Sequence, residues 1–132
     1  MEEFTLEHIG YLTDNIENTA EAFKLFGFQP EVISNDDTQQ TRICFLKKPG
    51  ETTIELVEPY EENKTMMKML KKGVSAYHTC YAVDDISAAY KRLTDMDYTP
   101  LFEPVEAPAF GQRLICYFWK RETGLIEIVS KK

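Results

Sequence analysis

The sequence predicts an α+β fold in which two βαβββ modules form a curved mixed sheet. The first observation is an internal repeat, because residues 7–30 align with residues 77–100 at an offset of 70. The second is that residues 40–57 align with residues 112–129 at an offset of 72. The third is that the same order of expected elements, strand, helix and three strands, occurs in both halves. Self-similarity at a fixed spacing indicates a duplicated unit, here of about 60 residues.

The aligned positions include residues with distinctive chemistry. The chain has two histidines, and the repeat places them at equivalent positions, as His8 and His78. A glutamate within an apolar strand also recurs, as Glu55 in Ile-Glu-Leu-Val and Glu127 in Ile-Glu-Ile-Val. These four residues are therefore the candidates for a shared site.

Length and composition indicate one globular domain over residues 1–132, with internal repeats at about 4–58 and 76–130. A chain of 132 residues is long enough to bury a core without disulfides or metals. Its content of 43% hydrophobic and 28% charged residues is typical of a globular protein.

Charge and cysteine content indicate which ligands and which cellular compartment suit the protein. The net charge is −7, and no run of basic residues is longer than two, as at Lys71-Lys72 and Lys131-Lys132, which argues against nucleic acid as a ligand. The acidic amino terminus resembles no signal peptide, and no apolar run is long enough to span a bilayer. Three cysteines in apolar runs favour a reduced, cytoplasmic protein.

Apolar periodicity and turn residues predict the elements of the first repeat. Asp14 or Asn15 is expected to cap the helix, and Gly27 to end it. The expected elements are a strand at 4–13, a helix at 16–26, a strand at 28–34, a turn at 35–37, and strands at 40–47 and 52–58.

A linker at 59–72, with a short helix around Met66 to Leu70, joins the repeats. Asp84 or Asp85 is expected to cap the helix of the second repeat. The expected elements there are a strand at 76–83, a helix at 86–96, a strand at 98–103, a loop at 104–111, and strands at 112–119 and 125–130.

Glu55 and Glu127 lie within apolar strands, where burying a charged carboxylate is energetically unfavourable. Side chains in a strand alternate between faces, so Glu55 shares its face with Thr53 and Val57, and Glu127 has an equivalent setting. Burying an unpaired carboxylate costs several kcal/mol unless it is protonated, paired or bound to metal. A single such glutamate or histidine is more often an edge or structural residue, but the repetition of both favours a ligand role.

If a pseudo-twofold axis relates the repeats, His8, Glu55, His78 and Glu127 converge on it. Two imidazoles and two carboxylates suit one divalent ion of Ni, Zn, Co or Mn. The sequence therefore predicts a metal cavity at the sheet.

Four motifs occur in a specific order along nearly the whole chain. They are His-Ile-Gly-Tyr at 8–11, Ile-Glu-Leu-Val-Glu-Pro at 54–59, Tyr-His-Thr-Cys-Tyr-Ala-Val-Asp-Asp-Ile at 77–86, and Gly-Leu-Ile-Glu-Ile-Val at 124–129. With them, the chain resembles the vicinal oxygen chelate superfamily of glyoxalases, bleomycin resistance proteins and dioxygenases. The resemblance implies that His8, Glu55, His78 and Glu127 are metal ligands.

Within that superfamily, the set of two histidines and two acids is similar to glyoxalase I and methylmalonyl-CoA epimerase. Extradiol dioxygenases use two histidines and one carboxylate, and bleomycin-binding proteins usually lack the full set. The resemblance implies a metal-dependent glyoxalase I-like lyase of the lactoylglutathione lyase type. The alternatives are an epimerase-like isomerase and a non-catalytic small-molecule binding or resistance protein. The Ser-Pro-Ile of the epimerase linker is absent at 63–67, which weighs against a CoA thioester.

Both enzymatic alternatives share one step, in which a carboxylate removes the proton next to a carbonyl and a metal stabilises the enediolate or enolate. The resemblance gives Glu127 the role of base and makes Glu55 the partner acid. It also implies a small-molecule substrate and, in the glyoxalase branch, glutathione or another thiol as cosubstrate. A homodimer is compatible with the resemblance. Candidate anion contacts are Arg42, Arg113 and Lys120, although each would more often be a solvated charge.

Overall fold

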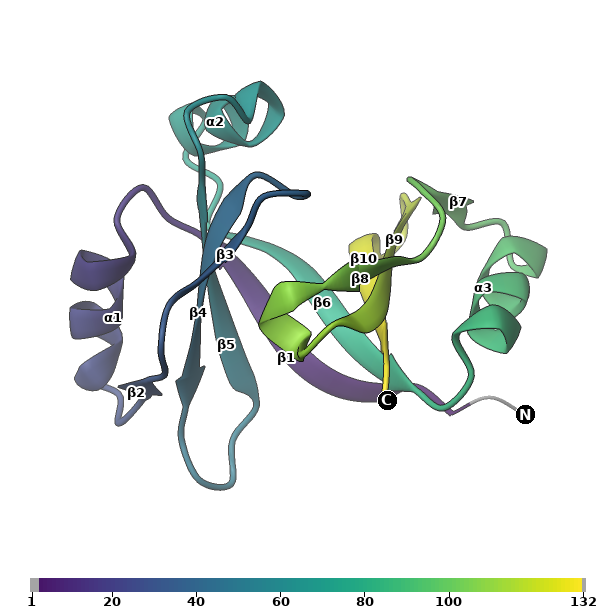
Figure 1. Cartoon of the computed structure of the whole chain (residues 1–132), viewed down its shortest axis with the longest axis horizontal. Coiled ribbons are helices and arrows are strands. Elements are labelled where there is room, and N and C mark those ends of the chain that lie inside the picture. The colour runs from purple at the N-terminus through teal and green to yellow at the C-terminus, as the bar shows by residue number, and fades with distance from the viewer. Residues whose placement is uncertain (1–2, 132) are drawn as a thin grey trace. The chain divides into compact units, whose positions relative to one another are not determined.

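The computed structural model describes residues 3–131 of the chain (Figure 1). These residues form three α-helices, one short 3₁₀ helix and ten strands that pair in both parallel and antiparallel directions. The chain divides into two compact units, one spanning His8–Tyr77 and the other formed by residues 3–7 and 78–131 of the described chain. Strands β1 (Thr5–Leu12) and β6 (Ala76–Val83) contribute residues to both units.

The unit His8–Tyr77 contains one parallel and several antiparallel strand pairs. Its strand order is β2-β4-β5-β1, in which β1 and β5 are parallel. Strand β3 pairs with β4 along the same edge as β2. Its elements after β1 are α1 (Ile16–Lys24), β2 (Gln29–Pro30), β3 (Ser34–Asp36), β4 (Thr41–Lys47), β5 (Thr53–Pro59) and α2 (Lys64–Lys71).

The second unit repeats this arrangement. Its strand order is β7-β9-β10-β6, in which β6 and β10 are parallel, and β8 pairs with β9. Its elements after β6 are α3 (Ile86–Asp95), β7 (Thr99–Pro100), β8 (Val105–Ala107), the 3₁₀ helix η1 (Pro108–Phe110), β9 (Arg113–Lys120) and β10 (Gly124–Ser130). The α+β class and the two βαβββ modules are therefore confirmed.

The two long helices begin at equivalent caps. The Asn15 side chain accepts a hydrogen bond from the Asn18 backbone N–H at 2.9 Å, and Asp85 accepts one from that of Ala88 at 3.1 Å. Each cap satisfies one of the N–H groups that the first turn of a helix leaves without a partner. In both repeats the second of the two candidate residues is the cap.

Each helix packs on one face of its own strands and forms a separate core (Figure 1). The core under α1 consists of Ile16, Ala20, Phe28, Cys44, Leu46, Ile54 and Leu56. The core under α3 consists of Val83, Ile86, Ala89, Leu93, Cys116, Phe118, Ile126 and Ile128. Because side chains alternate along a strand, Glu55 and Glu127 point to the face away from these helices.

Two short edge strands differ from the sequence prediction. The turn expected at 35–37 is displaced, because residues Ser34–Asp36 pair with β4 and the chain turns at residues 37–40. The Asp36 carboxylate accepts a hydrogen bond from the Gln39 backbone N–H at 2.9 Å. Asp36 therefore ends β3 and stabilises the turn after it, rather than lying within the turn.

The strand expected at 98–103 is limited to Thr99–Pro100, and the loop expected at 104–111 contains β8 and η1. Proline has no backbone N–H to donate, which restricts it to the ends and edges of strands. Pro104 and Pro108 bound β8 on either side, and the three residues between them pair with β9.

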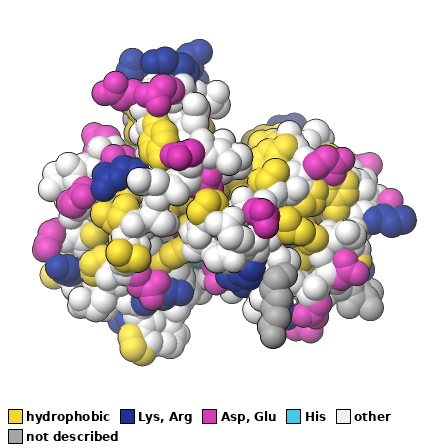
Figure 2. Space-filling model, viewed as in Figure 1, with side chains coloured by type: hydrophobic (Ala, Val, Ile, Leu, Met, Phe, Trp, Pro, Cys, Tyr) yellow, Lys and Arg dark blue, Asp and Glu magenta, His cyan; other side chains and the backbone are white. Residues whose placement is uncertain are grey.

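Helix α2, in the linker, has no fully buried residue. Lysine side chains gather over it on the face shown in Figure 2, whereas acidic side chains are spread more widely. Among the described residues, no helix combines the length and the apolar character that a bilayer crossing requires.

We predict that truncating either core destabilises the protein by about 2–5 kcal/mol, because the cavity adds to the lost apolar burial. Leu56 and Ile128 are both 0% exposed, one in each core, and Leu56→Ala and Ile128→Ala are the tests. Leu25→Ala is the matched control, because Leu25 is 83% exposed and should change stability by less than about 0.5 kcal/mol. Urea unfolding measures all three. A core variant as stable as the control would contradict the packing described.

Candidate metal centre

The first predicted pair of ligands lies on the parallel strands β1 and β5. The register pairs His8 with Thr53, and Glu55 follows two residues later on the same face. The distance from His8 Nε2 to Glu55 Oε1 is 3.3 Å. His8 is 0% and Glu55 is 2% exposed, so the pair is buried.

The second predicted pair repeats this geometry on β6 and β10. Thr79 pairs with Ile126, which places His78 level with Leu125 and two residues from Glu127. The distance from His78 Nε2 to Glu127 Oε1 is 3.1 Å, and the residues are 4% and 1% exposed. The structure therefore brings each histidine to the glutamate of its own repeat, with Nε2 facing the carboxylate in both.

An aromatic ring lies next to each pair. Phe45 is opposite Glu55 in the β4–β5 ladder, and its ring centroid is 6.0 Å from that of His8. Tyr117 is opposite Glu127, and its ring centroid is 5.4 Å from that of His78, edge to face. The repeat alignment matches Phe45 with Tyr117, but sequence reasoning assigned neither residue a place at the site. These rings reduce the access of water to the imidazoles.

Each pair can act in two ways. With one proton between them, the imidazole and the carboxylate form a charge-assisted hydrogen bond. With that proton removed, Nε2 and a carboxylate oxygen become two donors for a cation, and histidine and carboxylate are common ligands of divalent transition metals. A cation also offsets the cost of burying a carboxylate. The donor set in each unit thus fits half of a metal site.

The three basic residues that the sequence suggests as anion contacts each donate hydrogen bonds to groups of the protein itself. Arg42 donates to the Glu58 carboxylate at 3.1 Å and to Glu17 at 3.2 Å, and these contacts raise its pKa. Arg113 donates to the backbone carbonyl of Phe110 at 3.1 Å, and Lys120 to that of Met96 at 2.8 Å.

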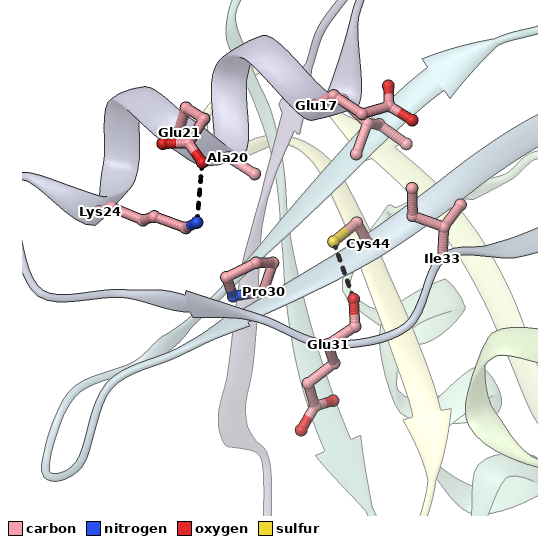
Figure 3. Close-up of a pocket in the computed structure, with 9 residues that line it drawn as sticks. Glu17, Ala20, Glu21, Lys24, Pro30, Glu31, Ile33 and Cys44 are labelled. Atoms are coloured by element: carbon pink, nitrogen blue, oxygen red, sulfur yellow. Dashed lines mark hydrogen bonds and ion pairs between the residues drawn. The ribbon is translucent and has the colours of Figure 1, made fainter.

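A cavity of about 290 Å³ is lined by α1, by β2 and the segment that follows it, and by β4 (Figure 3). Cys44 lines it, and its thiol donates to the backbone carbonyl of Glu31 at 3.3 Å. At its rim, Lys24 forms an ion pair with Glu21 at 2.8 Å. The lining residues include none of the four predicted ligands, so this cavity is separate from the His–Glu pairs.

The cysteines at equivalent positions of β4 and β9 are poor nucleophiles. Burial raises the pKa of the Cys44 thiol. Burial, followed by the negative charge of Glu103, raises the pKa of Cys116 to about 12. The thiolate is the reactive form, and a raised pKa keeps both side chains protonated. Both cysteines therefore act as small apolar residues of the two cores.

We predict that Ellman's reagent at pH 8 reacts slowly with these two thiols in the native protein. A pKa of about 12 leaves on the order of a thousandfold less thiolate than free cysteine, whose pKa is about 8.5. Cys80→Ala isolates the pair, and the same variant in urea provides the fast reference rate. Rapid labelling of the folded variant would contradict the burial of Cys44 and Cys116.

Comparison with known proteins agrees with this architecture. The family model described as the Glyoxalase/Bleomycin resistance protein/Dioxygenase superfamily matches residues 7–117. The comparison with curated protein sequences finds no match.

Solved structures share the fold at low sequence identity. A hypothetical protein from Bacillus halodurans is 23% identical, with a TM-score of 0.86 and coverage of 98% of this chain and 96% of its own. Methylmalonyl-CoA epimerase from Mycobacterium tuberculosis is 22% identical, with a TM-score of 0.85 and coverage of 97% and 88%. The Streptomyces coelicolor epimerase in complex with 2-nitronate-propionyl-CoA is 20% identical, with a TM-score of 0.84 and coverage of 97% and 98%.

The family match covers most of the chain and includes both histidines and Glu55. It agrees with the two βαβββ modules, and it ends before Glu127. The chain therefore belongs to the glyoxalase/bleomycin resistance protein/dioxygenase superfamily, which has the vicinal oxygen chelate fold.

Proposed function

We propose that His8, Glu55, His78 and Glu127 together hold one divalent metal ion, and that residues 1–132 act as a single domain around it. The observation that carries this proposal is the presence of the same buried His–Glu pair in both units, with Nε2 to Oε1 distances of 3.3 and 3.1 Å. Each pair supplies two donors, whereas a divalent transition metal takes four or more. Two half-sites of this kind suit one Ni, Zn, Co or Mn ion.

The proposed activity is removal of a proton from the carbon next to a carbonyl group, in a glyoxalase I-like lyase. A bound divalent cation supplies a Lewis acid that stabilises the negative charge developing on the carbonyl oxygen. The protein has to supply a base, and with both histidines as ligands a carboxylate takes this role. Family resemblance favours Glu127, with Glu55 as the partner acid.

The fate of the proton distinguishes the reactions. Glu127 takes the proton, the C–H bond breaks, and its electron pair moves towards the carbonyl oxygen. Return of the proton to the neighbouring carbon, with transfer of the substrate's hydroxyl proton to the former carbonyl oxygen, completes a lyase reaction of the lactoylglutathione type. Glutathione or another thiol is the cosubstrate. Phe45 and Tyr117, packed on the histidines, limit the access of water to this step.

An epimerase is the second candidate, because return of the proton to the opposite face of the same carbon inverts that centre. It is favoured by the likeness in fold to methylmalonyl-CoA epimerases, one of them in complex with a CoA ester analogue. A non-catalytic binding protein is the third. Purified protein assayed with the methylglyoxal–glutathione hemithioacetal and with methylmalonyl-CoA separates the first two, and hydrogen exchange with neither substrate favours the third.

We propose the reducing cytoplasm as the compartment, because all three cysteines are buried as small apolar side chains. A homodimer is our proposal for the assembly, and equilibrium sedimentation tests it.

We predict that His78→Ala lowers metal occupancy at least tenfold, because it removes one imidazole donor from a buried site. Metal content is measured by mass spectrometry after dialysis against a weak chelator. Leu114→Ala is the control, because Leu114 lies at the surface of the same unit and is 36% exposed. Metal stoichiometry in His78→Ala equal to that of the control would remove His78 from the ligand set.

We predict that Glu127→Gln slows proton abstraction by 10²–10⁴-fold, the usual contribution of a positioned general base. The amide keeps the size of the side chain and one oxygen for the metal, but it has no useful basicity. Exchange of the substrate α-proton in D₂O, followed by NMR, measures the step before any product forms. Glu55→Gln should have a smaller effect.

The exposed Glu106, on β8 of the same unit, provides the matched control as Glu106→Gln. Equal losses in Glu55→Gln and Glu127→Gln would favour a mechanism in which both carboxylates move the proton. Full exchange in metal-loaded Glu127→Gln would require a different base.

A further inference from the structure

The two repeats differ at one matched position beside the glutamates. Position 47 on β4 and position 119 on β9 are equivalent at the offset of 72 that aligns Glu55 with Glu127. The first is lysine and the second is Trp119, the single tryptophan of the chain. The residues opposite them also differ in polarity, because the polar Thr53 in one repeat corresponds to the apolar Leu125 in the other.

Strand register places Trp119 on the face that carries Glu127. In the β9–β10 ladder, Tyr117 is opposite Glu127 and Trp119 is opposite Leu125. Residues two apart on a strand share a face, so these four side chains lie on the same side of the sheet. Phe118 lies between Tyr117 and Trp119 in sequence and points to the other side, into the core under α3.

The indole of Trp119 is unusually accessible for its position. It is 51% exposed, whereas Glu127 on the same face is 1% exposed. The ring extends towards Gly124 at the start of β10, where an added Cβ would lie 3.9 Å from it. Tryptophan offers a large, rigid apolar surface that stacks well on planar or apolar groups.

We propose that Trp119 and Leu125 form a recognition surface for an apolar or planar substituent of the substrate. This inference rests on the proposed function, because it places the reacting carbon next to Glu127 and extends the substituent along the same face. The equivalent position in the other repeat has the opposite character. The Lys47 ammonium is exposed and lies 5.7 Å from the Phe45 ring centroid, so no apolar platform exists there.

Hydroxamic acids test the surface, because they chelate metals through two neighbouring oxygens and differ only in the attached group. Acetohydroxamate, hexanohydroxamate and benzohydroxamate are titrated into the metal-loaded protein by calorimetry. Hexano- and benzohydroxamate should bind about tenfold more tightly than acetohydroxamate, because their extra apolar surface leaves water. Trp119→Ala should abolish most of this gain and leave the affinity for acetohydroxamate unchanged.

Lys47→Ala is the matched control, because it alters the equivalent position of the other repeat and should keep the tenfold gain. The inference is overturned if Trp119→Ala retains the gain in full. It is also overturned if Lys47→Ala loses as much of the gain as Trp119→Ala does.

The fluorescence of Trp119 separates failure of this inference from failure of the proposed function. Its emission should shift to the blue in wild-type protein and in Lys47→Ala, and more with hexanohydroxamate than with acetohydroxamate. If acetohydroxamate binds His78→Ala as tightly as it binds the wild type, the proposed metal site is wrong. The Trp119 emission with hexanohydroxamate then still reports whether the apolar surface binds the ligand. Emission that hexanohydroxamate leaves unchanged up to its solubility limit overturns the inference.

Discussion

The contact between a buried imidazole and a buried carboxylate is the constraint on which the rest of the molecule depends. In each unit a glutamate that is at most 2% exposed faces the Nε2 atom of a histidine. A carboxylate removed from water is costly without a proton, a cation or several hydrogen bonds to compensate it. The strands hold two such groups where an apolar side chain would stabilise the fold at lower cost. This is the kind of local conflict with packing that marks functional sites.

The surrounding elements keep these pairs in position. Parallel pairing of β1 with β5, and of β6 with β10, sets each histidine two residues out of register with its glutamate. Because strand side chains alternate, the same strands present their other residues to α1 and α3, which complete the two cores. The helices therefore fix the register, and the register fixes the distance between imidazole and carboxylate. A slip of one residue would turn the glutamate into the helix-packed core.

Much of this arrangement could be predicted from the repeat, because duplication makes weak local signals appear twice. His8 and Glu55 would each have been ordinary alone, and their recurrence as His78 and Glu127 made them candidates. The edge strands β3 and β8 were missed, since an Asp-rich or Pro-rich segment can pair through its backbone while its side chains indicate a turn. The positions of Phe45, Tyr117 and Trp119 beside the pairs depend on strand register, which apolar periodicity does not determine.

X-ray absorption spectroscopy of the zinc-loaded protein tests most directly whether both pairs serve one ion. We expect one zinc ion per chain, with two imidazole nitrogens and carboxylate oxygens at about 2.0–2.2 Å. Replacing His8 with alanine should lower the imidazole number from two to one. Two ions per chain, or a single ion whose spectrum fits one imidazole in the unaltered protein, would contradict the account.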